Sequence, residues 1–214
     1  MFFKYIPFTY HWIVRRAVGA NVKTILDLGC GEGDFMKDLS ENGNWDITGV
    51  ELHSESAQKA KQSGIYKAVV RGDVTNLPRD VLNRKYDVVF SSQTLEHLKK
   101  SDGRKALETW EKLAKKRIVV TTPVGFIEYE PIEEKKENNP LQKHLSGWSI
   151  KEMKALGFAV YGQGARFIYG KKGLARKFSG ILPLWFVISY IASPFVYFFP
   201  EYATYMIAVK NLND

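Results

Sequence analysis

The chain contains 214 residues, of which 45% are hydrophobic, and it carries a formal net charge of +8. This length and composition suit a single α/β domain over residues 1–214, with its own core and modest additions. The single cysteine excludes an intramolecular disulfide and a multi-cysteine metal site, which favours a cytoplasmic setting. No signal peptide is evident, because the first residues lack a basic region followed by an uninterrupted apolar one.

Residues 1–22 are rich in aromatic and basic side chains. Aromatic and aliphatic residues run from Phe2 to Ile13 with few charges, and Arg15 and Arg16 follow. This composition fits an N-terminal helix packed on the main sheet. With its cations it also fits a surface that faces anionic lipid.

A glycine turn follows the first predicted strand, residues 24–28. Gly29, Gly31 and Gly33 come directly after the strand, and a helical apolar spacing begins at Asp34. A strand, a glycine turn and a helix N-terminus together bring backbone N–H groups close to a ligand. A dinucleotide fingerprint would need glycine at position 34, so the ligand is predicted to be of another kind.

Polar residues also follow the next three predicted strands. The strand at 47–51 ends in Glu51, and Asp73 follows the strand at 68–71. In nucleoside-binding α/β folds, an acid at the tip of the second strand accepts hydrogen bonds from ribose hydroxyls. Ser91 and Gln93 follow the strand at 87–90. These residues predict a nucleoside site along one edge of the sheet.

The pattern D-x-G-x-G-x-G from Asp27 to Gly33 resembles the first motif of the class I S-adenosylmethionine (SAM)-dependent methyltransferases. Residues 91–98 resemble the segment after strand four in small-molecule methyltransferases, including those of quinone biosynthesis. The resemblance implies SAM as cofactor, S-adenosylhomocysteine as product and a hydrogen bond from the adenine amino group to Asp73. It also implies that residues 1–22 form a lid over SAM. The implied cofactor-binding residues are Asp27, Gly29, Cys30 (through its backbone and small size), Gly31, Gly33, Glu51, Leu52, Asp73, Val74, Ser91 and Gln93.

Alternating strands and helices predict a doubly wound, mostly parallel α/β sheet. A fifth strand is expected at 117–121, after a helix at 103–115. The family resemblance adds strand six at 158–167 and an antiparallel strand seven at 202–209, which completes a seven-stranded Rossmann-like sheet. The polar run 128–140 is predicted to be an exposed loop.

An apolar insert at 174–200 separates strands six and seven. Residues 179–200 carry no charge, and their number is near the ~20 that cross a bilayer. Pro183 and Pro194 should kink or break a continuous helix. Because strand seven must return to the sheet, we expect the insert either to enter a membrane and come back or to lie along its interface, as a pair of short helices bent near Ser193 and Pro194 would do. A buried core hairpin is the alternative.

These features predict a SAM-dependent methyltransferase for a small, hydrophobic or lipid-linked acceptor, at the inner face of the membrane. His144 is the predicted catalytic base, with His97 and Glu130 as further candidates. No metal site is predicted. An RNA methyltransferase is one alternative, although no [DN]-P-P-[YF] tetrad follows strand four and nucleic acid is therefore not the expected partner. A SAM-binding protein without catalysis is the other alternative.

Overall fold

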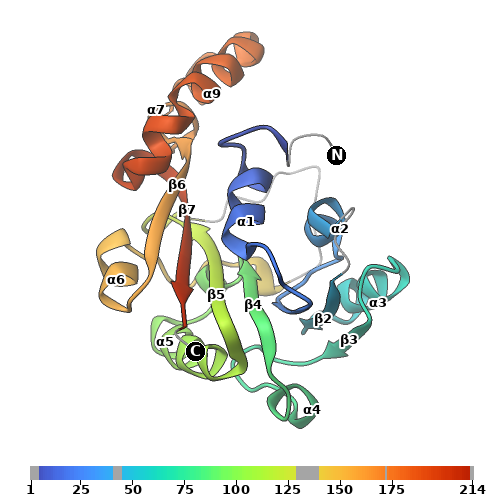
Figure 1. Ribbon diagram of the computed structural model, residues 1–214. Coiled ribbons are helices and arrows are strands. Elements are labelled where there is room, and N and C mark those ends of the chain that lie inside the picture. Colours follow the sequence, from blue (N-terminus) through green and yellow to red (C-terminus); the bar gives the residue numbers. More distant parts are fainter. Residues whose placement is uncertain (1–4, 41–44, 129–139, 172, 213–214) are drawn as a thin grey trace.

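The protein folds around a seven-stranded sheet in the order β3-β2-β1-β4-β5-β7-β6. Its computed structural model describes residues 5–40, 45–128, 140–171 and 173–212 (Figure 1). Strands β1 to β5 pair in parallel, and β7 lies antiparallel between β5 and β6. The strands are β1 (Thr24–Leu28), β2 (Asp46–Glu51), β3 (Ala68–Arg71), β4 (Tyr86–Ser92), β5 (Ala114–Pro123), β6 (Ala159–Ala165) and β7 (Ala203–Asn211).

Helices cover both faces of the sheet. Buried side chains of α1, α2 and α3 pack on one face, and those of α4, α5 and α6 pack on the other. These helices are α1 (Tyr10–Val18), α2 (Asp34–Ser40), α3 (Ser54–Gln62), α4 (Arg79–Leu82), α5 (Lys100–Leu113) and α6 (Ile150–Ala155). This arrangement confirms the predicted doubly wound, mostly parallel sheet.

Local sequence explains the ends of several helices. Thr9 caps α1 by accepting a hydrogen bond from the backbone of Trp12, and Gly19, at φ 82°, ends the helix. Ser149 and Glu152 form a capping box at the start of α6, as their spacing predicts. Helix α5 begins at Lys100, three residues before the predicted start. Residues 129–139 of the predicted loop, including Glu130, lie outside the described residues.

The segment between β6 and β7 contains α7 (Arg166–Tyr169), α8 (Leu174–Lys177) and α9 (Leu182–Phe198). Helix α9 extends beyond the layered part of the molecule (Figure 1). The prediction of two short helices is wrong, since α9 continues through Pro194. Pro183 lies in the first helical turn, where its missing N–H would have no partner, and Pro194 removes only one internal hydrogen bond.

Most of α9 is exposed. By length and composition, Ser179–Phe198 could cross a membrane, with a mean hydropathy of 1.7 and only 11% of the segment buried. Within α9, Ser189 and Val196 are buried, whereas Phe186 and Ile191 are 67% and 73% exposed. The helix is therefore not the buried core hairpin considered as an alternative.

Candidate functional site

Two adjoining cavities lie at the edge of the sheet where the parallel strands end. The larger has a volume of about 850 Å³, and the smaller about 280 Å³. Gly29, Gly31 and Gln93 line both cavities, so the cavities meet beside the glycine turn. The turn after β1 and the turn after β4 thus form a wall that the two cavities share.

The glycine turn is held by the neighbouring strand. The backbone N–H of Gly29 donates to the Val50 carbonyl at 2.8 Å, and that of Gly31 donates to Oε2 of Glu51 at 2.9 Å. Gly29, Gly31 and Gly33 have φ angles of 73°, 55° and 92°, in the left-handed region where glycine is favoured. A Cβ on Gly31 would meet nothing within 4 Å, so this position faces open space.

The smaller cavity contains the two acids predicted to bind a nucleoside. Glu51 and Leu52 line it from the end of β2, and Asp73 and Val74 line it from the end of β3. Glu51 Oε1 accepts the backbone N–H of His53 at 2.7 Å, and Asp73 Oδ1 accepts the N–H of Thr75 at 2.7 Å. These bonds fix the carboxylates at the cavity wall, where each oxygen retains capacity to accept another hydrogen bond.

Asp27 lines the larger cavity from inside β1 and is only 4% exposed. The hydroxyl of Tyr66 donates to Oδ2 of Asp27 at 2.7 Å. Burial raises the pKa of the Asp27 carboxyl to about 7, although the Tyr66 hydrogen bond opposes this shift. Burial also raises the pKa of the Cys30 thiol, so Cys30 is neutral at physiological pH.

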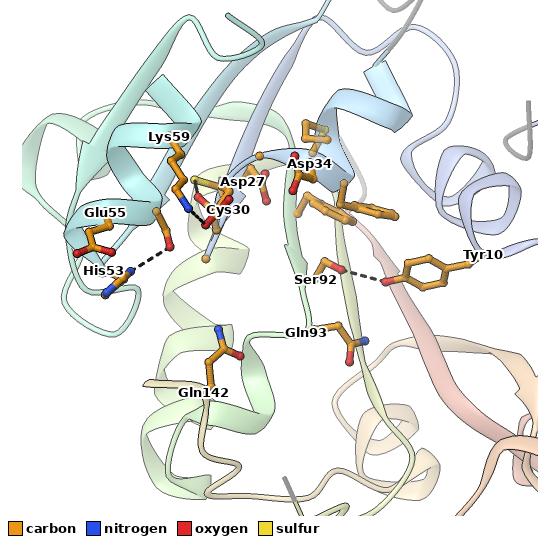
Figure 2. Close-up of a pocket in the computed structure, with 18 of the residues that line it drawn as sticks. Tyr10, Asp27, Cys30, Asp34, His53, Glu55, Lys59, Ser92, Gln93 and Gln142 are labelled. Carbon is orange, nitrogen blue, oxygen red and sulfur yellow. Dashed lines mark hydrogen bonds and ion pairs between the residues drawn. The ribbon is translucent and has the colours of Figure 1, made fainter. Parts of the chain in front are cut away.

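The opposite wall of the larger cavity carries hydroxyl groups (Figure 2). The Tyr10 hydroxyl lies 2.9 Å from Ser92 Oγ and 2.7 Å from Thr121 Oγ1. Gln93 has a φ of 52°, and its side-chain amide donates to Thr121 Oγ1 at 3.3 Å. A glutamine in this left-handed conformation is uncommon and typical of functional sites. Gln163 and Tyr205 complete this wall from β6 and β7.

Glu96, His97 and His144 meet beside the smaller cavity. One potential ligand atom from each lies within 4.8 Å of the others. His97 Nδ1 lies 3.2 Å from the Lys143 carbonyl, and His144 Nδ1 lies 2.6 Å from the Ile127 carbonyl. Because carbonyl oxygens only accept, both Nδ1 atoms must carry hydrogen, which makes each Nε2 the basic or metal-ligating atom.

Glu96 is buried at 2% exposure, and burial raises the pKa of its carboxyl to about 7. Its Oε2 accepts a hydrogen bond from Thr122 Oγ1 at 3.0 Å, whereas its buried Oε1 has no hydrogen-bond partner among the described residues. A carboxylate and two histidines can hold a divalent cation such as Mn²⁺ or Zn²⁺. The sequence did not predict this cluster, because His144 joins it from a distant loop.

The structure brings most of the predicted cofactor residues to the cavities. The residues that line one or both are Asp27, Gly29, Cys30, Gly31, Gly33, Glu51, Leu52, Asp73, Val74 and Gln93. Ser91 differs, because it is buried and its hydroxyl donates to the Leu28 carbonyl at 3.0 Å. His144 lines neither cavity, although its neighbours Lys143 and Leu145 line the smaller one. Tyr10, Thr94 and Gln142 are lining residues that were not predicted individually, although Tyr10 and Thr94 lie in the segments 1–22 and 91–98 that the resemblance indicated.

The fold and the two cavities define an α/β protein with a candidate ligand site at the carboxyl edge of its sheet. A glycine turn, two strand-end acids and a second wall of hydroxyl and amide groups surround that site. Ligands of open α/β sheets bind at this edge.

Comparisons with known proteins find similarity to methyltransferases. Residues 25–117 match the family model described as a methyltransferase domain. The chain is 31% identical over 96 residues to the ubiquinone biosynthesis O-methyltransferase of Serratia proteamaculans, covering 43% of this chain and 39% of the relative. It is 30% identical over 112 residues to the enzyme of the same name from Erwinia tasmaniensis, covering 51% and 45%. The chain thus spans less than half the length of these curated relatives.

A solved structure of the plantazolicin methyltransferase BpumL in complex with S-adenosylhomocysteine shares the fold, with a TM-score of 0.59 and 15% identity. The superposition covers 97% of this chain and 83% of that one. Together these findings indicate a methyltransferase domain in residues 25–117, and the chain shares its fold with a solved methyltransferase.

Proposed function

We propose that this protein transfers a methyl group from SAM to a small, hydrophobic or lipid-linked acceptor at the cytoplasmic face of a membrane. The observation that carries the proposal is the junction of the two cavities at Gly29, Gly31 and Gln93. The cofactor end comprises the glycine turn, Glu51 and Asp73. The acceptor end comprises Tyr10, Gln93 and the Glu96–His97–His144 cluster. A donor and an acceptor bound at these ends meet at the shared wall.

The cofactor end binds SAM through groups already fixed in place. Glu51 would accept hydrogen bonds from the ribose hydroxyls, and Asp73 would accept one from the adenine amino group. Asp27 faces the larger cavity and would pair with the ammonium group of SAM, which favours its charged form. Because the sulfonium methyl is already activated, the protein contributes mainly by positioning donor and acceptor.

The acceptor end supplies a base. His144 Nε2 would accept the proton of an acceptor hydroxyl, because His144 Nδ1 is bonded to the Ile127 carbonyl. Burial lowers the pKa of His97, so this neighbouring ring is neutral at physiological pH and does not repel a protonated His144. If His144 Nε2 instead ligated a divalent cation together with Glu96 and His97, that nitrogen would not serve as the base. A bound divalent cation would lower the pKa of the acceptor hydroxyl and stabilise its oxyanion.

A hydrophobic acceptor fits the surface around the cavities. Phe126, Leu141 and Leu145 are exposed beside this edge of the sheet, at 62%, 41% and 49%. The exposed face of α9 leaves the same edge, because β6 ends and β7 begins there. An apolar acceptor carried by a bilayer would therefore reach the site without crossing water.

Transfer of label from methyl-labelled SAM tests the proposal. Label should enter a lipid extract and not RNA when the full chain is incubated with both. A His144→Asn variant should bind S-adenosylhomocysteine as the wild type does but transfer at least about 100-fold more slowly, and it should bind Mn²⁺ more weakly. His53→Asn, which changes a histidine outside the cluster, is the control for Mn²⁺ binding. Label in RNA alone would support an RNA methyltransferase instead. Cofactor binding without any transfer would support a SAM-binding protein without catalysis.

A further inference from the structure

The exposed apolar surface of α9 is one-sided. Trp185, Ile188 and Val196 pack in a small core with α7 and α8. On the other side of the helix, Phe186, Ile191 and Phe198 are 67%, 73% and 67% exposed. The surface extends to further exposed apolar residues in and beside the insert, namely Phe167, Phe178, Ile181, Leu182, Leu184, Val187, Tyr190, Phe195 and Phe199. Contiguous apolar surface of this extent marks an interaction site.

The charge beside this surface indicates its partner. Residues 166–200 contain five basic residues and no acidic one. All five precede α9, and the exposed helix itself is uncharged. An apolar face bordered by cations suits the headgroup region of a bilayer that contains anionic lipid.

The insert is attached to the sheet at both ends. Ala165, the last residue of β6, pairs with Ala203, the first residue of β7. The chain that follows α9 packs tightly against β6. A Cβ on Gly162 of β6 would lie 2.8 Å from the Ala203 side chain and 2.9 Å from Pro200, so only glycine fits there. One side of helix α9 is therefore exposed while its other side contacts the domain.

Tyr197 joins α9 to the N-terminal segment. Its ring stacks on Tyr161 of β6 at 4.8 Å between centroids and contacts the rings of Phe8 and Trp12 at 5.5 and 6.4 Å. Phe8 has a φ of 63°, a conformation that a phenylalanine adopts only where surrounding contacts hold it. The end of α9 and the start of α1 thus share one aromatic cluster.

The same N-terminal segment reaches the cavity. Tyr10, two residues after Phe8, lines the larger cavity, and its hydroxyl bonds to Ser92 (Figure 2). The same hydroxyl also bonds to Thr121. A continuous series of contacts therefore leads from the exposed face of α9, through Tyr197 and Phe8, to the cavity wall. A change in the order of α9 would change how firmly Tyr10 is held there.

We propose that a bilayer containing anionic lipid is an activating partner of this protein. Its surface binds the exposed face of α9, and the Tyr197–Phe8 contact then holds α1 and Tyr10 against the larger cavity. This inference rests on the proposed function, which places the ammonium end of SAM beside Asp27 in that cavity. Because coupling between two ligands is reciprocal, vesicles should tighten cofactor binding by the factor by which the cofactor tightens vesicle binding.

Flotation and calorimetry on the full chain test both steps. With phosphatidylcholine vesicles containing phosphatidylglycerol, the wild type should float, and its affinity for S-adenosylhomocysteine should rise about fivefold or more. Vesicles of phosphatidylcholine alone should have a smaller effect on both. Ile191→Asp changes the most exposed position of α9 and should abolish flotation together with the rise in affinity.

Tyr197→Ala separates docking from coupling. This variant should float as the wild type does but lose the rise in affinity, whereas Tyr197→Phe, which keeps the ring contacts, should retain it. If Tyr197→Ala does not fold, Phe8→Ala removes the same contact from the other side. Wild-type protein that does not float, or that floats without any change in affinity, would refute the proposal.

Two further outcomes are distinguishable. If the surface instead mediates self-association, the wild type should dimerise without floating and Ile191→Asp should be monomeric, which would also refute the proposal. The affinity measurement needs no methyl acceptor. Vesicle-dependent cofactor affinity without methyl transfer to lipid would therefore leave this inference standing and refute the proposed acceptor.

Discussion

The proposed cofactor end of the site is made by backbone groups and by carboxylates that directly follow strands, whereas the proposed acceptor end is made by side chains from distant segments. Gly29, Gly31 and Glu51 lie within two consecutive strand–turn–helix units. By contrast, Tyr10 meets Thr121, and His97 meets His144. The first arrangement needs only the sheet to form, while the second also needs the loops and α1 to pack correctly. Substitutions should therefore affect the first end through local geometry and the second through long-range packing.

The largest effect is expected from Gly31→Val. The new side chain would occupy the open space that both cavities share, so binding of S-adenosylhomocysteine should weaken by about 100-fold or more in calorimetry. Gly64→Val is a matched control, because Gly64 also has a positive φ and nothing within 4 Å of its Cβ position but lines neither cavity. Equal losses in the two variants would assign the effect to backbone strain rather than to lost space.

Glu51→Ala should have the next largest effect. It removes the predicted ribose contacts and the acceptor that holds the Gly31 N–H, so cofactor binding should weaken by roughly 2–4 kcal/mol. Asp46→Ala removes an exposed acid at the other end of β2, whose ion pair with Lys67 contributes little, and should change binding by less than about 0.5 kcal/mol. An unchanged calorimetric affinity for Glu51→Ala would contradict the nucleoside assignment.

The smallest effect concerns the pH dependence of stability. The pKa of Asp27 is raised from 3.8 to about 7, so between these values folded protein holds a proton that unfolded protein has released. The free energy of unfolding should therefore fall as pH rises from about 4 to 7, with Asp27 contributing roughly 1–3 kcal/mol.

Asp27→Asn keeps an oxygen for the Tyr66 hydroxyl and should flatten this dependence in denaturant titrations. Glu96 has a similarly raised pKa and should leave part of the slope in place. An unchanged slope in Asp27→Asn would show that Asp27 titrates normally.

The sheet and the cofactor end were predictable because their signals are local. Each strand is a short apolar run, and the acids at Glu51 and Asp73 immediately follow their strands. Ser91 was assigned to the site on the same basis, but its hydroxyl bonds to the Leu28 carbonyl of β1 instead of facing the cavity. Successive residues of a strand point to opposite sides of the sheet. Its neighbour Ser92 is the one that lines the cavity.

The acceptor end was less predictable because its contacts depend on how loops return to the sheet. Nothing near His97 in the sequence indicates that His144 will pack against it at 4.9 Å between ring centroids. The continuity of α9 was also missed. Pro194 suggests a break, yet one lost backbone hydrogen bond did not outweigh the bonds along the rest of the helix.

The pairing of Ala165 with Ala203 gives the outer helices a closed base within the sheet itself. Because the entropic cost of closing a loop grows only slowly with its length, the chain between these residues can lengthen, shorten or be replaced at little cost to the seven strands. Residues 166–202 therefore form a segment that can be exchanged without changing how the strands pair. A protein built on this plan can exchange this segment, and with it the surface that we propose contacts a bilayer, while the register of its central strands stays intact.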